Sequence, residues 1–192
     1  MAGDALALDA AERALRSEQV IVLPTDTVYG LAALPASDRA IDRIYALKGR
    51  PLSMPIAFLV ASREQVESLA GPVSPEADRL MVAFWPGPLT VVLAERGGDG
   101  TVGVRCPDHE FVRSLAARVG PLAVTSANRH GAPTPAAAFD AASSLDGEVD
   151  LVVDGGSCPG TASTVVNGTD PSLPVLREGP IRREQVVAAA LR

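Results

Sequence analysis

The sequence predicts an α/β fold, in which helices flank a twisted, mixed β-sheet and a ligand cleft lies at the strand ends. Short apolar runs alternate along the chain with segments of helical periodicity. Several neighbouring strand candidates have no helix between them, so a strictly parallel sheet is not expected. Hydrophobic residues make up 47% of the chain and aromatic residues only 4%. We therefore expect a core of mainly Ala, Val, Leu and Ile, within one domain spanning residues 1–192.

Capping residues and apolar periodicity predict the helices. Ser37 or Asp38 begins one that ends near Gly49. Ser74 precedes a proline at a first helical position, and Asp108 caps a later helix. Ser62 and Gln65 read as a capping box. With their caps, the expected helices cover residues 8–17, 37–49, 62–70, 74–85, 108–119, 134–142 and 181–191.

Short apolar runs bounded by Gly, Pro or Asp predict the strands. The glycine-rich segment 97–100 lies between two of these runs and predicts a hairpin loop. The expected strands cover residues 20–23, 55–60, 89–94, 101–105, 122–125, 149–153, 163–166 and 175–177.

The charge balance limits the function classes. A formal net charge of −6 and a pI of about 4.9 argue against broad nucleic-acid binding, which needs a basic surface. No apolar run reaches membrane-spanning length, and the N-terminus has no signal-peptide pattern, so we expect a cytoplasmic protein. Cys106, Cys158, His109 and His130 could in principle form a zinc site, but their spacing is typical of one only at Cys106 and His109.

Polar residues follow several predicted strands, where open α/β sheets bind ligands. The turn 24–31 holds Asp26 with three hydroxyl residues, a pattern that ordinary Asx and ST turns also show. Arg105 ends another strand and could form a bidentate pair with a carboxylate or phosphate. The segment 125–128 offers small hydroxyl and amide residues. Gly155 and Gly160 have phosphate-loop spacing without the Walker lysine, so they suggest at most a backbone anion nest.

The chain has a single lysine among its 17 basic residues, and this lysine, Lys48, lies two residues before Arg50. Two cations this close repel each other unless an anion lies between them. The pair therefore predicts an anionic ligand, with compositional bias as the alternative.

Seven motifs together resemble the YrdC-like threonylcarbamoyl-AMP synthases, and they occur in that family's order over most of the chain. They are Pro24-Thr-Asp-Thr-Val-Tyr-Gly-Leu31, Lys48-x-Arg50-Pro51, Trp85-Pro-Gly-Pro-Leu-Thr90, Arg105-x-Pro-x-His109, Ser126-Ala-Asn128, Ser163-Thr-Val165 and Leu176-Arg177. The resemblance implies the YrdC-like fold, in a short, single-domain form.

The resemblance implies a nucleotidyltransferase that condenses L-threonine, bicarbonate or CO₂, and ATP into threonylcarbamoyl-AMP and pyrophosphate. A separate transferase complex would then use this product to modify tRNA. The resemblance also implies Mg²⁺ bound to the ATP phosphates, no metal ligands from the protein and no organic cofactor. By the same resemblance, Lys48 and Arg50 are catalytic and contact the nucleotide, and Thr27, Arg105 and Ser163 bind threonine. The other nucleotide contacts implied are Thr90, Ser126, Asn128, Thr134 and Arg177.

The sequence departs from the family pattern at two places, and both bear on secondary substrate contacts. His130 follows the Ser126 motif, and the strand after Arg50 is apolar at 55–59. One alternative function is a carbamoyl-transfer enzyme related to hydrogenase maturation factors, although the accessory modules of those much longer chains are absent here. The other is a non-catalytic RNA-binding module, which the net charge of −6 disfavours.

Overall fold

One mixed sheet runs through the described part of the chain, residues 2–191 of a computed structural model with side chains described from residue 5. Its nine strands within that range are β1 (Ile21–Leu23), β2 (Gly30–Ala33), β3 (Ala57–Leu59), β4 (Leu89–Ala94), β5 (Thr101–Arg105), β6 (Leu122–Ser126), β7 (Leu151–Val152), β8 (Thr164–Asn167) and β9 (Val175–Arg177). They are ordered β7-β1-β2-β6-β3-β5-β4-β8-β9. The pairs β1/β7, β3/β5 and β4/β8 are parallel and the others antiparallel, which confirms the predicted mixed sheet.

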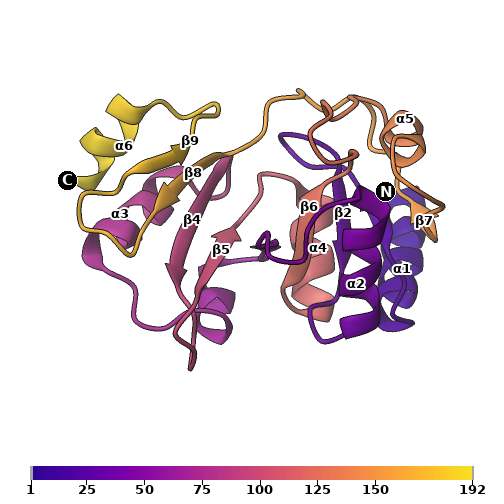
Figure 1. Cartoon of the computed structure of the whole chain (residues 1–192), viewed down its shortest axis with the longest axis horizontal. Helices are drawn as coiled ribbons and strands as arrows, with labels where there is room; N and C mark the ends of the chain where they lie inside the picture. The colour runs from indigo at the N-terminus through magenta and orange to yellow at the C-terminus, as the bar shows by residue number, and fades with distance from the viewer. Residues whose placement is uncertain (1, 192) are drawn as a thin grey trace.

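Helices cover this sheet in separate groups. They are α1 (Ala2–Arg16), α2 (Asp38–Lys48), the 3₁₀ helix η1 (Arg63–Ser68), α3 (Pro75–Phe84), α4 (Glu110–Val119), α5 (Ala138–Ser143) and α6 (Arg183–Ala190). Ile21 and Leu23 of β1 pack in one cluster with α1 and α4, while Val22 between them packs with α2 and α5. Helices α3 and α6 pack on β4, β5 and β8 at the other end of the sheet (Figure 1). Strand β3 lies at the middle of the sheet, between β6 and β5.

Several local predictions are confirmed. The Ser37 hydroxyl accepts a hydrogen bond from the Ala40 N–H at 3.2 Å and begins α2. The helix ends at Gly49, whose φ of 57° is left-handed and therefore favours glycine. Ser74 caps α3 in the same way as Ser37 caps α2. Strands β4 and β5 form the predicted antiparallel hairpin.

Two capping predictions are wrong. The Ser62 side chain makes no capping bond, and Gln65 instead accepts from the Ala61 N–H at 2.8 Å and donates to the Ala116 carbonyl at 2.8 Å. Asp108 pairs with Arg113 at 3.1 Å rather than capping α4, which begins one residue later than predicted. Gln65 and Asp108 therefore bond to other groups, and the Ser62 side chain caps no helix.

Element boundaries also differ from the predictions. Strand β2 was not predicted, because Gly-Leu-Ala-Ala has little β-propensity, and it is a strand through its pairing with β1 and β6. Helix α1 begins at Ala2 rather than at residue 8. The helix expected from residue 134 begins only at Ala138. Within residues 2–191, no helix is both long and apolar enough to span a membrane.

Candidate functional site

Two adjoining pockets form one cleft near the middle of the sheet. The Arg105 pocket, of about 80 Å³, is lined by Thr25, Thr27, Val28, Gly30, Ala57, Leu59, Thr90, Arg105, Val124, Thr125, Ser126 and Ser163. The Lys48 pocket, of about 420 Å³, is lined by Lys48, Arg50, Met54, Pro55, Ala57, Val124, Thr125, Ser126, Asn128, His130, Gly131 and Arg177. The two pockets adjoin, because four residues line both: Ala57, Val124, Thr125 and Ser126.

The cleft gathers nine of the ten candidate site residues, and only Thr134 lines neither pocket. Many lining residues begin or end a strand, as the strand-end prediction expected. Gly30 and Ala57 begin β2 and β3, while Arg105 and Ser126 end β5 and β6. The short strands therefore bring segments that are distant in sequence to a common opening.

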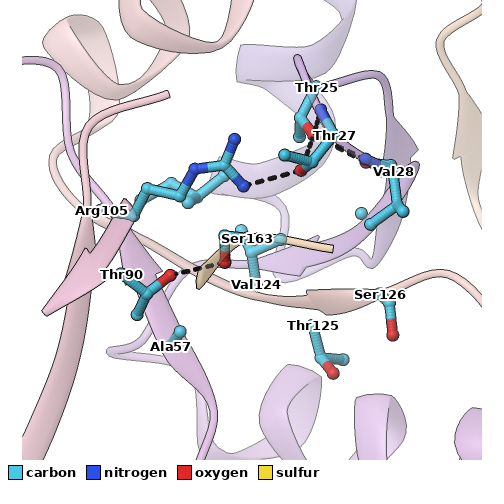
Figure 2. Close-up of a pocket in the computed structure, with 12 residues that line it drawn as sticks. Thr25, Thr27, Val28, Ala57, Thr90, Arg105, Val124, Thr125, Ser126 and Ser163 are labelled. Carbon is cyan, nitrogen blue, oxygen red and sulfur yellow. Dashed lines mark hydrogen bonds between the residues drawn. The ribbon is translucent and has the colours of Figure 1, made fainter. Parts of the chain in front are cut away.

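Arg105 is the cation among the residues that line its pocket (Figure 2). Its exposed fraction is only 5%. Its Nη1 donates to the Thr27 hydroxyl at 2.7 Å, its Nε donates to the Gly87 carbonyl at 3.0 Å, and its Nη2 forms an ion pair with Asp26. Burial lowers the pKa of Arg105, and Asp26 opposes that effect. A guanidinium has five N–H groups, so these contacts leave two N–H groups for a ligand.

An ST turn orients Thr27. The Thr25 hydroxyl accepts from the N–H groups of Thr27 and Val28 at 3.1 and 3.2 Å and donates to the Val28 carbonyl at 2.7 Å. The Thr25 and Thr27 hydroxyls also lie 2.9 Å apart, and either oxygen can be the donor. The Thr27 hydroxyl accepts from Arg105 Nη1 at 2.7 Å. The turn is therefore an ST turn, as the structural interpretation expected, and its Thr27 lines the Arg105 pocket.

A second pair of hydroxyls lines the same pocket. The Thr90 and Ser163 hydroxyls are 2.8 Å apart (Figure 2). Arg177 donates to the Ser163 carbonyl from Nε at 3.0 Å and from Nη2 at 2.9 Å. The pocket therefore has a guanidinium with Thr27 on one side and a fixed hydroxyl pair on another.

Lys48 reaches its pocket from the last turn of α2 and is only 3% exposed. Its Nζ donates to the Asn128 carbonyl at 2.7 Å, to the Asn128 Oδ1 at 3.2 Å and to the Ser126 carbonyl. These acceptors match the three N–H groups of an ammonium. Burial, with repulsion from Arg50, lowers the pKa of Lys48 to about 8. Lys48 thus holds the segment 126–128 in place and also contributes positive charge to the pocket.

Arg50 is held by neighbours on three sides. Its Nη1 donates to the Thr125 hydroxyl at 2.8 Å, its Nη2 donates to the Pro55 carbonyl at 3.0 Å, and its guanidinium lies 5.5 Å from the Tyr45 ring centroid. Its Nε is buried without a hydrogen-bond partner in the described structure. Thr125 belongs to the segment 125–128 that the sequence singled out, but the family resemblance assigned it no role.

The cleft is cationic although the chain is acidic overall. Lys48, Arg50, Arg105 and Arg177 line it, and among the lining residues within 2–191 there is no Asp or Glu. Asp26, which pairs with Arg105, lies outside the lining set. Such an arrangement can bind an anionic ligand along its length.

A family model for Sua5, YciO and YrdC proteins, described as telomere recombination, matches residues 13–179. The chain belongs to the Sua5/YciO/YrdC family. It is 40% identical to the threonylcarbamoyl-AMP synthase of Bacillus subtilis, over 91% of this chain and 54% of that protein. It is 38% identical to the putative threonylcarbamoyl-AMP synthase of Mycobacterium tuberculosis H37Rv, over 90% of this chain and 84% of that protein.

The structural relatives agree with this family. The crystal structure of P. abyssi Sua5 in complex with L-threonine is 36% identical, with a TM-score of 0.88, over 95% of this chain and 56% of that chain. The chain thus spans about half the length of some of the curated relatives it matches. The match confirms the fold class and the family resemblance expected from the seven motifs.

Three further sequence-based hypotheses are not supported. The N–H groups of Gly155 and Gly160 donate to the Tyr29 hydroxyl at 3.1 Å and the Thr27 carbonyl at 2.9 Å, so they do not form an anion nest. In residues 2–191, no three His, Cys, Asp or Glu side chains lie close enough to hold a metal, so the zinc site is not formed. Thr134, although expected at the nucleotide, lies outside both pockets.

Proposed function

We propose that this chain is a threonylcarbamoyl-AMP synthase that condenses L-threonine, bicarbonate or CO₂, and ATP. The observation that carries the proposal is the single cleft with two cationic ends, the Arg105 pocket and the Lys48 pocket, which share four lining residues. Two substrates bound at the two ends would meet over the shared part. The names of the Bacillus and Mycobacterium relatives support the same reaction.

Threonine fits the chemistry of the Arg105 pocket. The two remaining N–H groups of Arg105 can pair with the α-carboxylate of an amino acid in the bidentate way that guanidinium favours. Thr27 and Arg105 orient each other at 2.7 Å, so the guanidinium is held in place before the ligand arrives. Ser163 supplies a hydroxyl beside this position, and Leu59 and Val124 supply apolar surface for the substrate methyl group.

ATP fits the larger Lys48 pocket. A volume of about 420 Å³ is in the range of ordinary small-molecule sites. Lys48, Arg50 and Arg177 supply positive charge for the phosphates, and Ser126 and Asn128 line the same pocket. Thr90, also expected at the nucleotide, lines the Arg105 pocket instead. Mg²⁺ would enter with ATP as part of the substrate, because the residues described around the cleft offer it no carboxylate.

The reaction balances without a protein nucleophile. The threonine amine and bicarbonate form a carbamate and release water. A carbamate oxygen then attacks the α-phosphorus, and the bond from that phosphorus to the pyrophosphate oxygen breaks. Both reactants are anionic, so fixed cations that bring them together and stabilise the developing charge account for catalysis.

Further proposals follow from this reaction. The product would be consumed by a transferase that modifies tRNA, and both steps would take place in the cytoplasm. With a net charge of −6, we expect this chain itself to bind nucleic acid weakly.

Pyrophosphate release from ATP, measured with each substrate omitted in turn, tests the proposed function. We expect release only when threonine and bicarbonate are both present. Release that depends on carbamoyl phosphate would favour the carbamoyl-transfer alternative. An absence of release, combined with RNA binding that weakens steeply with salt, would favour the RNA-binding module.

A further inference from the structure

Arg177 lines one pocket and makes its hydrogen bonds to a residue of the other. It lines the Lys48 pocket, whereas Ser163 lines the Arg105 pocket. Two nitrogens of Arg177, Nε and Nη2, donate to the Ser163 carbonyl at 3.0 and 2.9 Å. Nη2 also donates to the Ser163 hydroxyl at 3.0 Å. The guanidinium thus fixes both the backbone and the side chain of Ser163.

The backbone after β9 is packed closely against the same residue. A Cβ added to Gly179 would lie 2.4 Å from the Thr164 nitrogen and 2.6 Å from the Ser163 carbonyl carbon. The Ser163 hydroxyl in turn lies 2.8 Å from the Thr90 hydroxyl. Strand β9 and the residues after it therefore hold Ser163, and through Ser163 they hold the hydroxyl pair of the Arg105 pocket.

We propose that Arg177 is a positioning residue for the amino-acid pocket, acting through Ser163, in addition to its place beside the nucleotide. The proposal rests on the function proposed above. The bonds to Ser163 use Nε and Nη2, so the two N–H groups of Nη1 remain for a phosphate. One guanidinium would then serve both ends of the cleft.

Threonine binding in the absence of nucleotide separates this role from a nucleotide contact alone. We would titrate the full chain with L-threonine by calorimetry, comparing wild type with Arg177→Ala, Ser163→Ala and the double variant. Arg177→Ala should raise the threonine Kd about tenfold, equivalent to about 1.4 kcal/mol. The double variant should bind threonine about as well as the single variant that binds it less tightly, because Arg177 is proposed to act through the Ser163 hydroxyl that the second change removes.

Two further variants serve as controls. Arg177→Lys keeps the charge but loses the planar fork that grips the Ser163 carbonyl, so it should also weaken threonine binding. Arg39→Ala removes an exposed arginine of α2 outside both pockets and should leave the threonine Kd unchanged. Thermal unfolding of each variant confirms that the titrations are made on folded protein. If Arg177→Ala does not fold, Arg177→Lys and Ser163→Ala provide the test.

Each outcome has a distinct meaning. If wild type binds threonine and Arg177→Ala or Arg177→Lys binds it equally well, Arg177 has no positioning role and the proposed function still stands. Additive losses in the double variant would likewise overturn the coupling through Ser163. If wild type itself does not bind threonine, the proposed function fails first.

Discussion

Replacing Thr27 by valine removes one hydroxyl from the centre of the Arg105 pocket while keeping nearly the same shape. Thr27 is 1% exposed, so water cannot readily replace the lost group. The change deprives Arg105 Nη1 of its acceptor at 2.7 Å and Thr25 of the hydroxyl at 2.9 Å. The substitution therefore tests the contribution of these hydrogen bonds while leaving the packing nearly unchanged.

The cost follows from those two contacts. A buried polar group left without a partner costs about 1–3 kcal/mol, and the Thr25 hydroxyl keeps its bonds to the backbone of Thr27 and Val28. We therefore expect a loss of about 2 kcal/mol in the free energy of unfolding, mainly from Arg105. For a chain of 192 residues that lowers Tm by about 4–8 °C. A less constrained Arg105 should also raise the threonine Kd about tenfold.

Thermal unfolding and calorimetric titration with threonine measure both effects. Thr27→Ser keeps the hydroxyl and should bind threonine nearly as wild type does. Thr134→Val is the matched control, because Thr134 lines neither pocket and its loss should affect neither Tm nor the threonine Kd. Wild-type threonine affinity in Thr27→Val would refute the role assigned to the contact between Thr27 and Arg105.

The other predictions concern the single lysine and the substrate. Selective ¹³C labelling of lysine gives one side-chain signal, whose titration midpoint should lie near pH 8, and a midpoint above 10 would contradict the effect of burial. The pKa of Lys48 is lower in the folded protein than in the unfolded chain, so the folded protein binds fewer protons between roughly pH 8 and 10.5. Over that pH range Lys48 therefore makes the free energy of unfolding rise with pH. The Lys48→Arg variant should lose most of its pyrophosphate release, because a planar guanidinium does not fit the three oxygens that surround the lysine ammonium. Near-normal release would instead mean that the single lysine reflects compositional bias. Serine should replace threonine with only a modest loss in kcat/KM, because one methyl group is worth about 1–3 kcal/mol, and equal efficiency or total rejection would oppose this.

Local signals in the sequence predicted much of the fold. The caps at Ser37 and Ser74 and the hairpin around residues 97–100 depend on neighbouring residues, and the structure has each of them. Strand β2 depends on partners about 10 and 90 residues away, so its own composition did not reveal it. The Ser62 and Gln65 capping box failed because Gln65 has a tertiary partner, the Ala116 carbonyl.

The site could be predicted as a set of residues but not as a set of contacts. The resemblance singled out Lys48, yet the convergence of three oxygens from residues 126–128 on its ammonium depends on how α2 meets the end of β6. The same is true of Thr125, which holds Arg50 across 75 positions of sequence. Thr134 shows the reverse case, a residue implied by resemblance that the structure leaves outside the cleft.

The identity of the adenylate formed with labelled bicarbonate tests the proposed function most directly. The full chain would be incubated with ATP, Mg²⁺, L-threonine and either ordinary or ¹³C bicarbonate. The products would then be separated and their masses measured by mass spectrometry. We predict a threonylcarbamoyl-AMP product whose mass rises by about one unit with the label, since a single bicarbonate carbon enters the carbamate in the proposed reaction. An adenylate of threonine that contains no bicarbonate carbon, or no adenylate at all, would contradict the reaction proposed for this cleft.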